Sequence, residues 1–516
     1  MHWLDWVVLG GYVATMVAIG AWANRRQTDT EAYFVGNRSM PWWAAGLSII
    51  ATSFSAASIL GVPGYAYADD MWYLQYQLGD IAAAIIVVLL FIPFFHKVRG
   101  LTTAYQYLEE RFDLKTRLLG SSLFSLTVLL RAGTLVYGAS LLFSAIAPSD
   151  LVPGLDAVEE SVVIFGIIAI IYTVLGGISA VIWTDVIQFT IMSLGVVAAM
   201  AVVVLGTPGG WGQAFADAGQ LDKLDVIHLQ EPLAGTGLLT AIFGYGLLAL
   251  SLFGTNQQPV QRYMTVKEPR EAQRALMLGV TAGVIGVTLS LLLGVFMFVF
   301  YDHFPNLLPA DFSPDQVMPH FVETQVPPIV TGALVAAVFA AAMSSLDSAL
   351  NSLAAALTVD WLTRFRPQTS EKARLGFAKV VVVVAGILGI AVGIYSARTE
   401  ALLIDLILSF MGYFAGGLLG LFLLGMLTRR ATGTGAFIGA IVGTLVVLMV
   451  TENDFGLPRL NELFGWEPIP FIWSTAIGLG VTMLVGYGLS FMGTPTPRER
   501  LANTSLAVRR PTGERI

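Results

Sequence analysis

The sequence predicts an all-α polytopic membrane protein. Of its 516 residues, 56% are hydrophobic and 12% are charged, whereas soluble domains carry about 25% charged residues. Apolar runs long enough to cross a bilayer as helices recur along the whole chain. The basic residues gather in alternate connecting segments, as is typical of multi-pass membrane proteins. These three features leave no room for a large soluble domain.

We expect thirteen transmembrane spans, with the N-terminus outside and the C-terminus inside. The first apolar run is followed by Arg25 and Arg26 and has no basic segment before it, so it is not a secretory signal. Of the 28 Lys and Arg residues, only Lys223, Arg398 and Arg459 fall in expected extracellular segments. The expected intracellular segments are 25–40, 97–117, 175–178, 257–274, 361–373, 428–431 and 494–516. The expected spans are 3–24, 41–67, 76–96, 118–147, 158–174, 179–206, 236–256, 275–302, 328–360, 374–397, 400–427, 432–451 and 470–493.

Two of these spans contain helix breakers. In the second, PWWAAGLSIIATSFSAASILGVPGYAYADD, three serines precede Gly61, Pro63 and Gly64, all of which weaken a helix. The seventh carries three glycines in FGYGLLALSLFGT. These spans lie five apart and run in opposite directions, as in an inverted repeat of five helices. Broken helices at matching positions in two halves indicate a transporter with its site near the bilayer midplane.

This arrangement gives the expected organisation of the chain. An extra helix and a cytoplasmic loop come first, followed by two inverted repeats separated by an extracellular loop, and then by two helices and a cytoplasmic tail. The corresponding ranges are 1–40 for the first part, 41–206 and 236–427 for the repeats, 207–235 for the loop, 428–493 for the last helices and 494–516 for the tail.

Residues 340–357, AAAMSSLDSALNSLAAAL, form an apolar span with a stripe of hydroxyl groups. On a helix, positions 341, 344/345, 348 and 352 share one face. Small residues in such a stripe could simply allow close helix packing. They also suit sodium, a hard cation that prefers oxygen ligands, as calcium and magnesium do. The hydroxyls of Ser344 and Ser345 could bind it together with carbonyls freed by the break in the second span.

Two charged residues inside spans are candidates for function. Asp185, in GGISAVIWTDVIQ, is costly in a membrane unless it is paired or hydrated, so it is half of a structural ion pair, a second sodium ligand or a coupling carboxylate. Arg131 could pair with Asp185, Asp80 or Asp347, or it could bind an anionic substrate through a two-pronged guanidinium contact. Gln77 could add an amide to that pocket.

Three stretches, GGISAVIWTDVIQ, TNQQPVQRYMTVKEPREAQRA and AAAMSSLDSALNS, occur in an order that resembles the sodium/solute symporter family. This family includes bacterial galactose, proline and sialic acid transporters. The resemblance covers about residues 1–495. It implies a LeuT-like inverted-repeat fold with one extra helix before the core and two after it, and it implies a sodium-coupled transporter instead of an enzyme.

The resemblance also implies ligand positions. The common sodium site of the family would use backbone carbonyls of the second span and small residues of the ninth, here Ala51, Phe54, Ala341, Ser344 and Ser345. A second sodium site, found in some members, would centre on Asp185 near Ser344 and Ser345. A monoanion carried with one sodium ion moves no net charge, so the membrane voltage would contribute nothing to its import. Two sodium ions restore that contribution, and we therefore expect two sodium ions per monoanion.

Fewer positions bear on which substrate the resemblance implies. Sugar carriers tend to have Glu-Gln where this chain has Ala57 and Ser58, and proline carriers have Asp-Met-Ser-Gly-Trp at 53–57, where this chain reads Ser-Phe-Ser-Ala-Ala. The pocket is most similar to that of the sialic acid carriers, at Ser53, Ser55, Ser58, Tyr73, Gln77 and Arg131. We therefore expect import of a small organic anion, sialic acid or another carboxylate; a sugar or neutral amino acid symporter is the alternative.

Other functions are less compatible with the sequence. The five histidines lie in loops or at span ends, which excludes paired haem ligands within the bilayer. A channel need not have two broken spans. The 494–516 tail is too short for the kinase of a sensor. A net charge of -7 gives no basic surface for nucleic acid. The expected partners are sodium ions, the substrate and the lipid bilayer, for a monomer in the cell inner (plasma) membrane.

Overall fold

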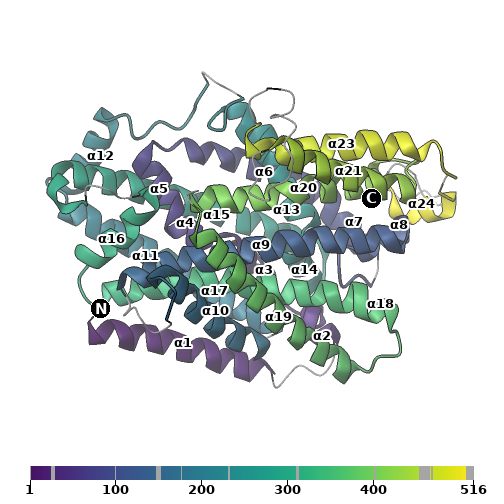
Figure 1. The fold of residues 1–516 in the computed structure, drawn as a ribbon, viewed down its shortest axis with the longest axis horizontal. Helices are drawn as coiled ribbons and strands as arrows, with labels where there is room; N and C mark the ends of the chain where they lie inside the picture. Colours follow the sequence, from purple (N-terminus) through teal and green to yellow (C-terminus); the bar gives the residue numbers. More distant parts are fainter. Residues whose placement is uncertain are drawn as a thin grey trace.

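The structure, a computed structural model, is a bundle of long helices (Figure 1). It describes residues 2–24, 30–98, 100–146, 153–175, 177–229, 233–309, 313–399, 402–451, 465, 469–494 and 496–506. Arg25, Arg26 and Arg459, which enter the charge argument above, lie outside these ranges. Within them, regular structure is helical and one isolated bridge joins Thr451 and Ile469.

Helices occupy every predicted span. Their bounds are α1 (Trp3–Asn24); α3 (Trp42–Ser53), α4 (Ala56–Ile59) and α5 (Gly61–Ala68); η2 (Trp72–Gln75), α6 (Tyr76–Ile86), η3 (Val87–Phe91) and α7 (Ile92–Lys97); α9 (Leu114–Ile146); α10 (Ala157–Leu175); α11 (Ile178–Gly206); η4 (Thr240–Tyr245) and α13 (Gly246–Thr255); α15 (Pro269–His303); α17 (Val330–Ala356), η7 (Leu357–Leu362) and α18 (Thr363–Phe365); α19 (Glu371–Ala397); α20 (Leu403–Leu427); α21 (Gly433–Val450); η8 (Phe471–Trp473) and α23 (Ser474–Ser490). Among the described residues, nine helices are long and apolar enough to cross a membrane, or ten if the bent α3–α5 pair is one span.

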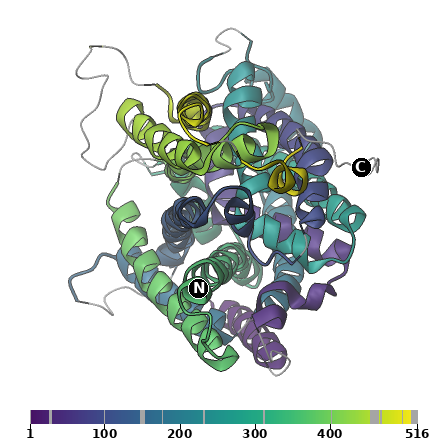
Figure 2. The same ribbon diagram turned by 90° about the vertical axis from the view of Figure 1, so that its right-hand side faces the viewer.

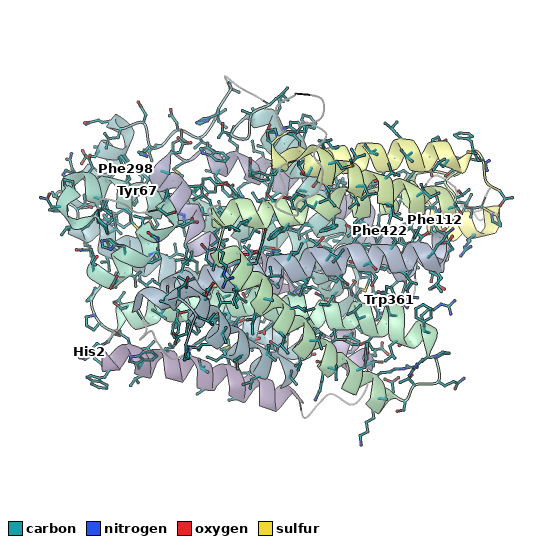
Figure 3. All side chains as sticks on the ribbon, in the orientation of Figure 1. His2, Tyr67, Phe112, Phe298, Trp361 and Phe422 are labelled. Carbon is teal, nitrogen blue, oxygen red and sulfur yellow. The ribbon has the colours of Figure 1, made fainter. Side chains whose placement is uncertain are left out.

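Shorter helices lie at the two ends of the bundle (Figure 1). Near one end are α12 (Gly210–Gln220) and α16 (Val317–Thr324), and near the other are α8 (Gln106–Arg111), α18 and α24 (Arg498–Thr504). The remaining connecting elements are α2 (Thr30–Val35), η1 (Gly36–Arg38), α14 (Gln257–Thr265), η5 (Pro305–Leu307) and η6 (Pro314–Gln316). Aromatic residues accompany both ends, as they do at membrane interfaces. Tyr67 and Phe298 lie together at the α12 end, and Trp361 lies toward the α18 end (Figure 3).

The second predicted span is broken, as its sequence indicated. α3 ends at Ser53, and the helix axis bends by 72° before α5. Phe54 and Ser55 are not helical, with ψ angles of 89° and -176°. Gly294 of α15 lets α5 approach closely, because a Cβ there would lie 2.1 Å from the Pro63 carbonyl oxygen. Phe54 and Ser55 are themselves buried, so the polar backbone at the break is enclosed by protein, which is where non-helical backbone is tolerated inside a membrane.

The expectation of a matching break in the seventh span is wrong. That span continues from a π-helical turn, η4, directly into α13, and the α3–α5 pair is the one sharply bent pair among the described residues. Its glycines serve close packing instead. A Cβ on Gly79 of α6 would lie 2.9 Å from the Cα of Gly246, so the two helices meet backbone to backbone.

α17 lies in the middle of the bundle, where it packs against α1, α3, α9 and α11. Its hydroxyl-bearing face is fully enclosed, and Ser344, Ser345 and Ser348 have no exposed surface. The first turn of α17 is held by a residue from another helix: Asp5 of α1 accepts hydrogen bonds from the backbone nitrogen atoms of Ile329 (2.7 Å) and Gly332 (3.0 Å). Viewed along the long axis, α21 and α23 cover one side of the bundle (Figure 2).

Candidate functional site

A cavity of about 130 Å³ lies beside the break between α3 and α5. Apolar residues of α13, α15 and α20 form much of its wall. Its polar lining includes all six residues that the sequence suggested for the substrate, from three separate stretches of the chain: Ser53, Ser55, Ser58, Tyr73, Gln77 and Arg131. Asp80 and Tyr245, which the sequence did not assign to the substrate, line the same cavity.

Arg131 is buried, with 6% of its surface exposed, and its guanidinium is held by neutral groups. Nη1 donates to the side-chain oxygen of Gln258 (3.2 Å), and Nη2 donates to the carbonyl of Thr52 (3.1 Å). Its Nε is buried and makes no hydrogen bond with the described residues. The two contacts orient the guanidinium beside the cavity, and no anionic group of the described residues pairs with its positive charge.

None of the three carboxylates considered as partners of Arg131 pairs with it in the described part of the chain. Asp80 accepts a hydrogen bond from the hydroxyl of Tyr245 (3.3 Å). Asp347 accepts one from Thr173 (2.5 Å). Asp185 pairs with a different arginine. A permanent ion pair is therefore not what holds Arg131 in the cavity wall.

The predicted ligands of the common sodium site converge where the end of α3 meets α17. The Ser344 hydroxyl donates to the carbonyl oxygens of Ala51 (2.8 Å) and Ala341 (3.0 Å). The Ser345 hydroxyl donates to the Thr52 carbonyl (3.0 Å). Phe54, the remaining predicted ligand, is the first non-helical residue after α3. The break thus supplies carbonyls, and α17 supplies hydroxyls, to one small, enclosed group of oxygen atoms.

Asp185 of α11 lies in a separate polar network. Its Oδ2 lies 3.1 Å from Nη2 of Arg262 and accepts a 2.5 Å hydrogen bond from the hydroxyl of Ser48. Arg262 also donates to Ser48 (2.7 Å) and to Ser348 (2.5 Å). No hydrogen bond of the described residues joins Asp185 to Ser344 or Ser345, which the sequence had placed near it. The carboxylate has a cationic partner, as the alternative of a structural ion pair required, while its Oδ1 makes no hydrogen bond with any described residue.

Arg262 was missed because residues 257–274 were expected to be an intracellular connecting segment. In the structure, every residue of α14, in the first half of this segment, is buried within the protein. The available signal was the polar stretch TNQQPVQR, which has too many amides for a helix that faces lipid. Three of these amides, the side chains of Gln257, Gln258 and Gln261, form hydrogen bonds with backbone or side-chain groups of other segments.

The carbonyl of Thr52 connects the two sites. It accepts hydrogen bonds from Arg131, in the cavity wall, and from Ser345, in the group of oxygen atoms on α17. The Thr52 hydroxyl lies 2.8 Å from that of Ser348, which Arg262 contacts. A displacement of the end of α3 therefore changes the contacts of the cavity arginine and of the α17 hydroxyls together.

Further polar contacts tie α9 to the end of α17. Arg117 donates to Asp360 through Nε (2.7 Å) and also pairs with Glu109 of α8 (2.8 Å), while Thr103 donates to Asp360 (2.6 Å). Burial opposes ionisation of Glu109, but its contacts with Arg117 and Arg364 outweigh that effect and lower its pKa. The elements that carry these contacts lie at the α8 and α18 end of the bundle (Figure 1).

Known proteins resemble this chain in sequence and in fold. The family model of the sodium:solute symporter family matches residues 33–443. A sodium/sialic acid symporter of Aliivibrio fischeri is 33% identical over 487 residues, which cover 94% of this chain and 92% of that protein. A solved Na+-coupled sialic acid symporter, in a substrate-bound outward-open state, has a TM-score of 0.82 and 30% identity over 95% of this chain and 98% of that chain.

A more distant solved structure shares the fold alone. It is Mhp1, a nucleobase-cation-symport-1 family transporter, with a TM-score of 0.56 and 16% identity over 91% of this chain and 97% of that chain. Both solved neighbours are transporters of the LeuT fold. The chain therefore belongs to the sodium:solute symporter family, and it is a multi-pass membrane protein that couples solute transport to sodium and is not an enzyme.

Proposed function

We propose that this symporter imports a small carboxylate together with sodium, and that sialic acid is its most suitable substrate. One observation carries the proposal: Arg131 presents a guanidinium to the cavity with no carboxylate of the described residues bound to it. A substrate carboxylate would complete its coordination through charge-assisted hydrogen bonds. The sialic acid symporters among its relatives support the choice of substrate.

We also propose two sodium sites. The first uses Ala51, Phe54, Ala341, Ser344 and Ser345. It is supported by the hydrogen bonds that join Ser344 to the carbonyls of Ala51 and Ala341, and Ser345 to the neighbouring carbonyl of Thr52. The second uses Asp185 with Ser344 and Ser345, and Oδ1 of Asp185 makes no hydrogen bond within the described part of the chain. Since Arg262 neutralises Asp185 in this structure, sodium can bind there strongly only in a state in which that ion pair loosens.

The transport cycle requires no chemistry on the substrate. Sodium at the first site joins the end of α3 to α17 and favours a state open to the outside. Because the Thr52 carbonyl contacts both Arg131 and Ser345, this step also fixes the arginine that receives the carboxylate. Sodium drives import only through its different affinity for the outward and inward states.

The proposed topology is thirteen spans with the N-terminus outside and the C-terminus inside, arranged as two inverted repeats at 41–206 and 236–427. The start of α1 and helix α24 lie toward opposite ends of the bundle, which supports an odd number of crossings (Figure 1). The remaining parts of the proposed organisation are the first helix with its cytoplasmic loop (1–40), the extracellular loop (207–235), the last two helices (428–493) and the cytoplasmic tail (494–516). We propose that the protein acts as a monomer in the cell inner (plasma) membrane.

A thermal-shift measurement on the purified protein tests the function. Sialic acid should raise the unfolding temperature in sodium buffer and not in potassium buffer, and sodium-driven uptake into vesicles should follow the same dependence. Glucose and proline serve as comparison ligands. Stabilisation by either of these, with no response to any carboxylate, would instead support the sugar or neutral amino acid alternative.

A further inference from the structure

Asp80 places a carboxyl group in the cavity that we propose to bind an anion. It lies on α6 three residues after Gln77, so the two side chains share one helix face. Both residues line the cavity together with Arg131 and Tyr245. Asp80 is only partly buried, in contrast to Arg131. A carboxylate here would repel a simple anion, so its presence requires an explanation.

One oxygen of Asp80 is held in place by the protein. Oδ2 accepts a hydrogen bond from the Tyr245 hydroxyl (3.3 Å), and the Tyr245 ring stacks on Tyr76 with ring centres 4.7 Å apart. No hydrogen bond or ion pair is found for Oδ1 among the described residues. Tyr245 therefore orients the carboxylate while one of its oxygens remains available to a ligand.

The two charges of the cavity belong to different walls. Arg131 is anchored to the end of α3 and to α14, through Thr52 and Gln258. Asp80 is anchored to η4 through Tyr245. They form no ion pair with each other, so each can act on a different part of one solute. A solute with its carboxylate at Arg131 would then extend its other end toward Asp80.

We propose that Asp80 accepts hydrogen bonds from hydroxyl or amide groups at the end of the substrate remote from its carboxylate. The cavity would then select polyhydroxylated carboxylates, such as sugar acids, over apolar monocarboxylates. The physical reason is that a site built to bind a hydroxyl group discriminates strongly against an analogue without one, since a polar protein group is then left unpaired. This inference rests on the proposed function, because it assumes that Arg131 receives the carboxylate.

Ligand titrations of the purified full-length protein in sodium buffer test the inference. The probes are sialic acid and cyclohexanecarboxylate, which has a carboxylate on a ring but no hydroxyl or amide group. Wild type should prefer sialic acid. Asp80→Ala and the nearly isosteric Asp80→Asn should weaken sialic acid binding by about tenfold to a hundredfold, the range for a hydrogen bond to a charged group. Both variants should bind cyclohexanecarboxylate at least as well as wild type, which also shows that they are folded.

Three results would count against these ideas in different ways. Unchanged sialic acid affinity in folded Asp80→Ala and Asp80→Asn overturns the role of Asp80 and leaves the anion symporter intact. Wild-type binding of cyclohexanecarboxylate as tight as that of sialic acid overturns the proposed selectivity even if the variants fail to fold. If neither carboxylate binds wild type in sodium, the proposed function fails, and the inference fails with it.

Discussion

Nη2 of Arg262 lies 3.1 Å from Oδ2 of Asp185, and neither side chain has any exposed surface. Arg262 comes from the short helix α14, and Asp185 comes from α11, 77 residues earlier. Ser48 of α3 and Ser348 of α17 contact the same guanidinium. This ion pair thus joins the two helices of the proposed first sodium site to two elements outside it.

Removing one partner of this pair should destabilise the protein strongly. Arg262→Met leaves an uncompensated buried carboxylate, and we expect a loss of about 3–5 kcal/mol in unfolding free energy. Thermal unfolding in detergent measures it. The double variant with Asp185→Asn should recover part of the loss. Arg364→Met, which removes an exposed pair with Glu109, is the control and should cost less than about 1 kcal/mol. Equal effects of the two arginine variants would contradict the structural role.

Loss of the Ser344 hydroxyl should weaken sodium binding. This hydroxyl contacts carbonyls of both α3 and α17, whereas among the described residues that of Ser352 bonds only to Ala349 of its own helix. In Ser344→Ala we expect the sodium concentration for half-maximal uptake to rise at least about tenfold, the loss of one contact to a charged group. Ser352→Ala should leave it within about twofold of wild type, a difference of under 1 kcal/mol. A Ser344→Ala protein with wild-type sodium dependence would remove this residue from the site.

Two replacements of Arg131 should distinguish the contribution of its charge to substrate binding from that of its planar guanidinium. Arg131→Lys keeps the charge and loses the planar fork, so sialic acid affinity should fall at least about tenfold, and Arg131→Ala should lower it further. Sodium-dependent stabilisation without substrate should persist in both variants. Titration calorimetry and thermal shift check the two quantities. Loss of folding in both variants would favour a purely structural role through Thr52 and Gln258.

Uptake should respond to membrane voltage. If two sodium ions accompany one monoanion, one net charge enters per cycle, and about 100 mV contributes about 2.3 kcal/mol. That energy corresponds to a change of about fiftyfold in the accumulation ratio. Vesicles with a potassium diffusion potential, negative inside, should therefore accumulate more substrate than vesicles at zero potential. Voltage-insensitive uptake would mean that a single sodium ion is carried.

A methyl group at Gly294 should disturb the broken span. It would lie 2.1 Å from the Pro63 carbonyl oxygen, so α5 and α15 must separate. We expect Gly294→Ala to cost about 1–3 kcal/mol, as overpacking does. Gly480→Ala in α23 is the matched control, since nothing lies within 4 Å of its added Cβ, and it should be neutral or stabilising. Equal unfolding temperatures for the two variants would refute the close approach.

The sequence by itself determined the helical membrane fold, the break after Ser53 and most of the proposed site residues. Apolar length, serine periodicity and helix breakers act locally, so they can be read along one segment. Tertiary structure decided which charges meet. Arg262 lies 77 positions from Asp185, and its buried position follows from the packing of α14 beneath α3 and α17. The partners of Arg131 and the orientation of Asp80 by Tyr245 were likewise fixed by helix packing, since glycine pairs such as Gly79 and Gly246 set how closely two backbones approach.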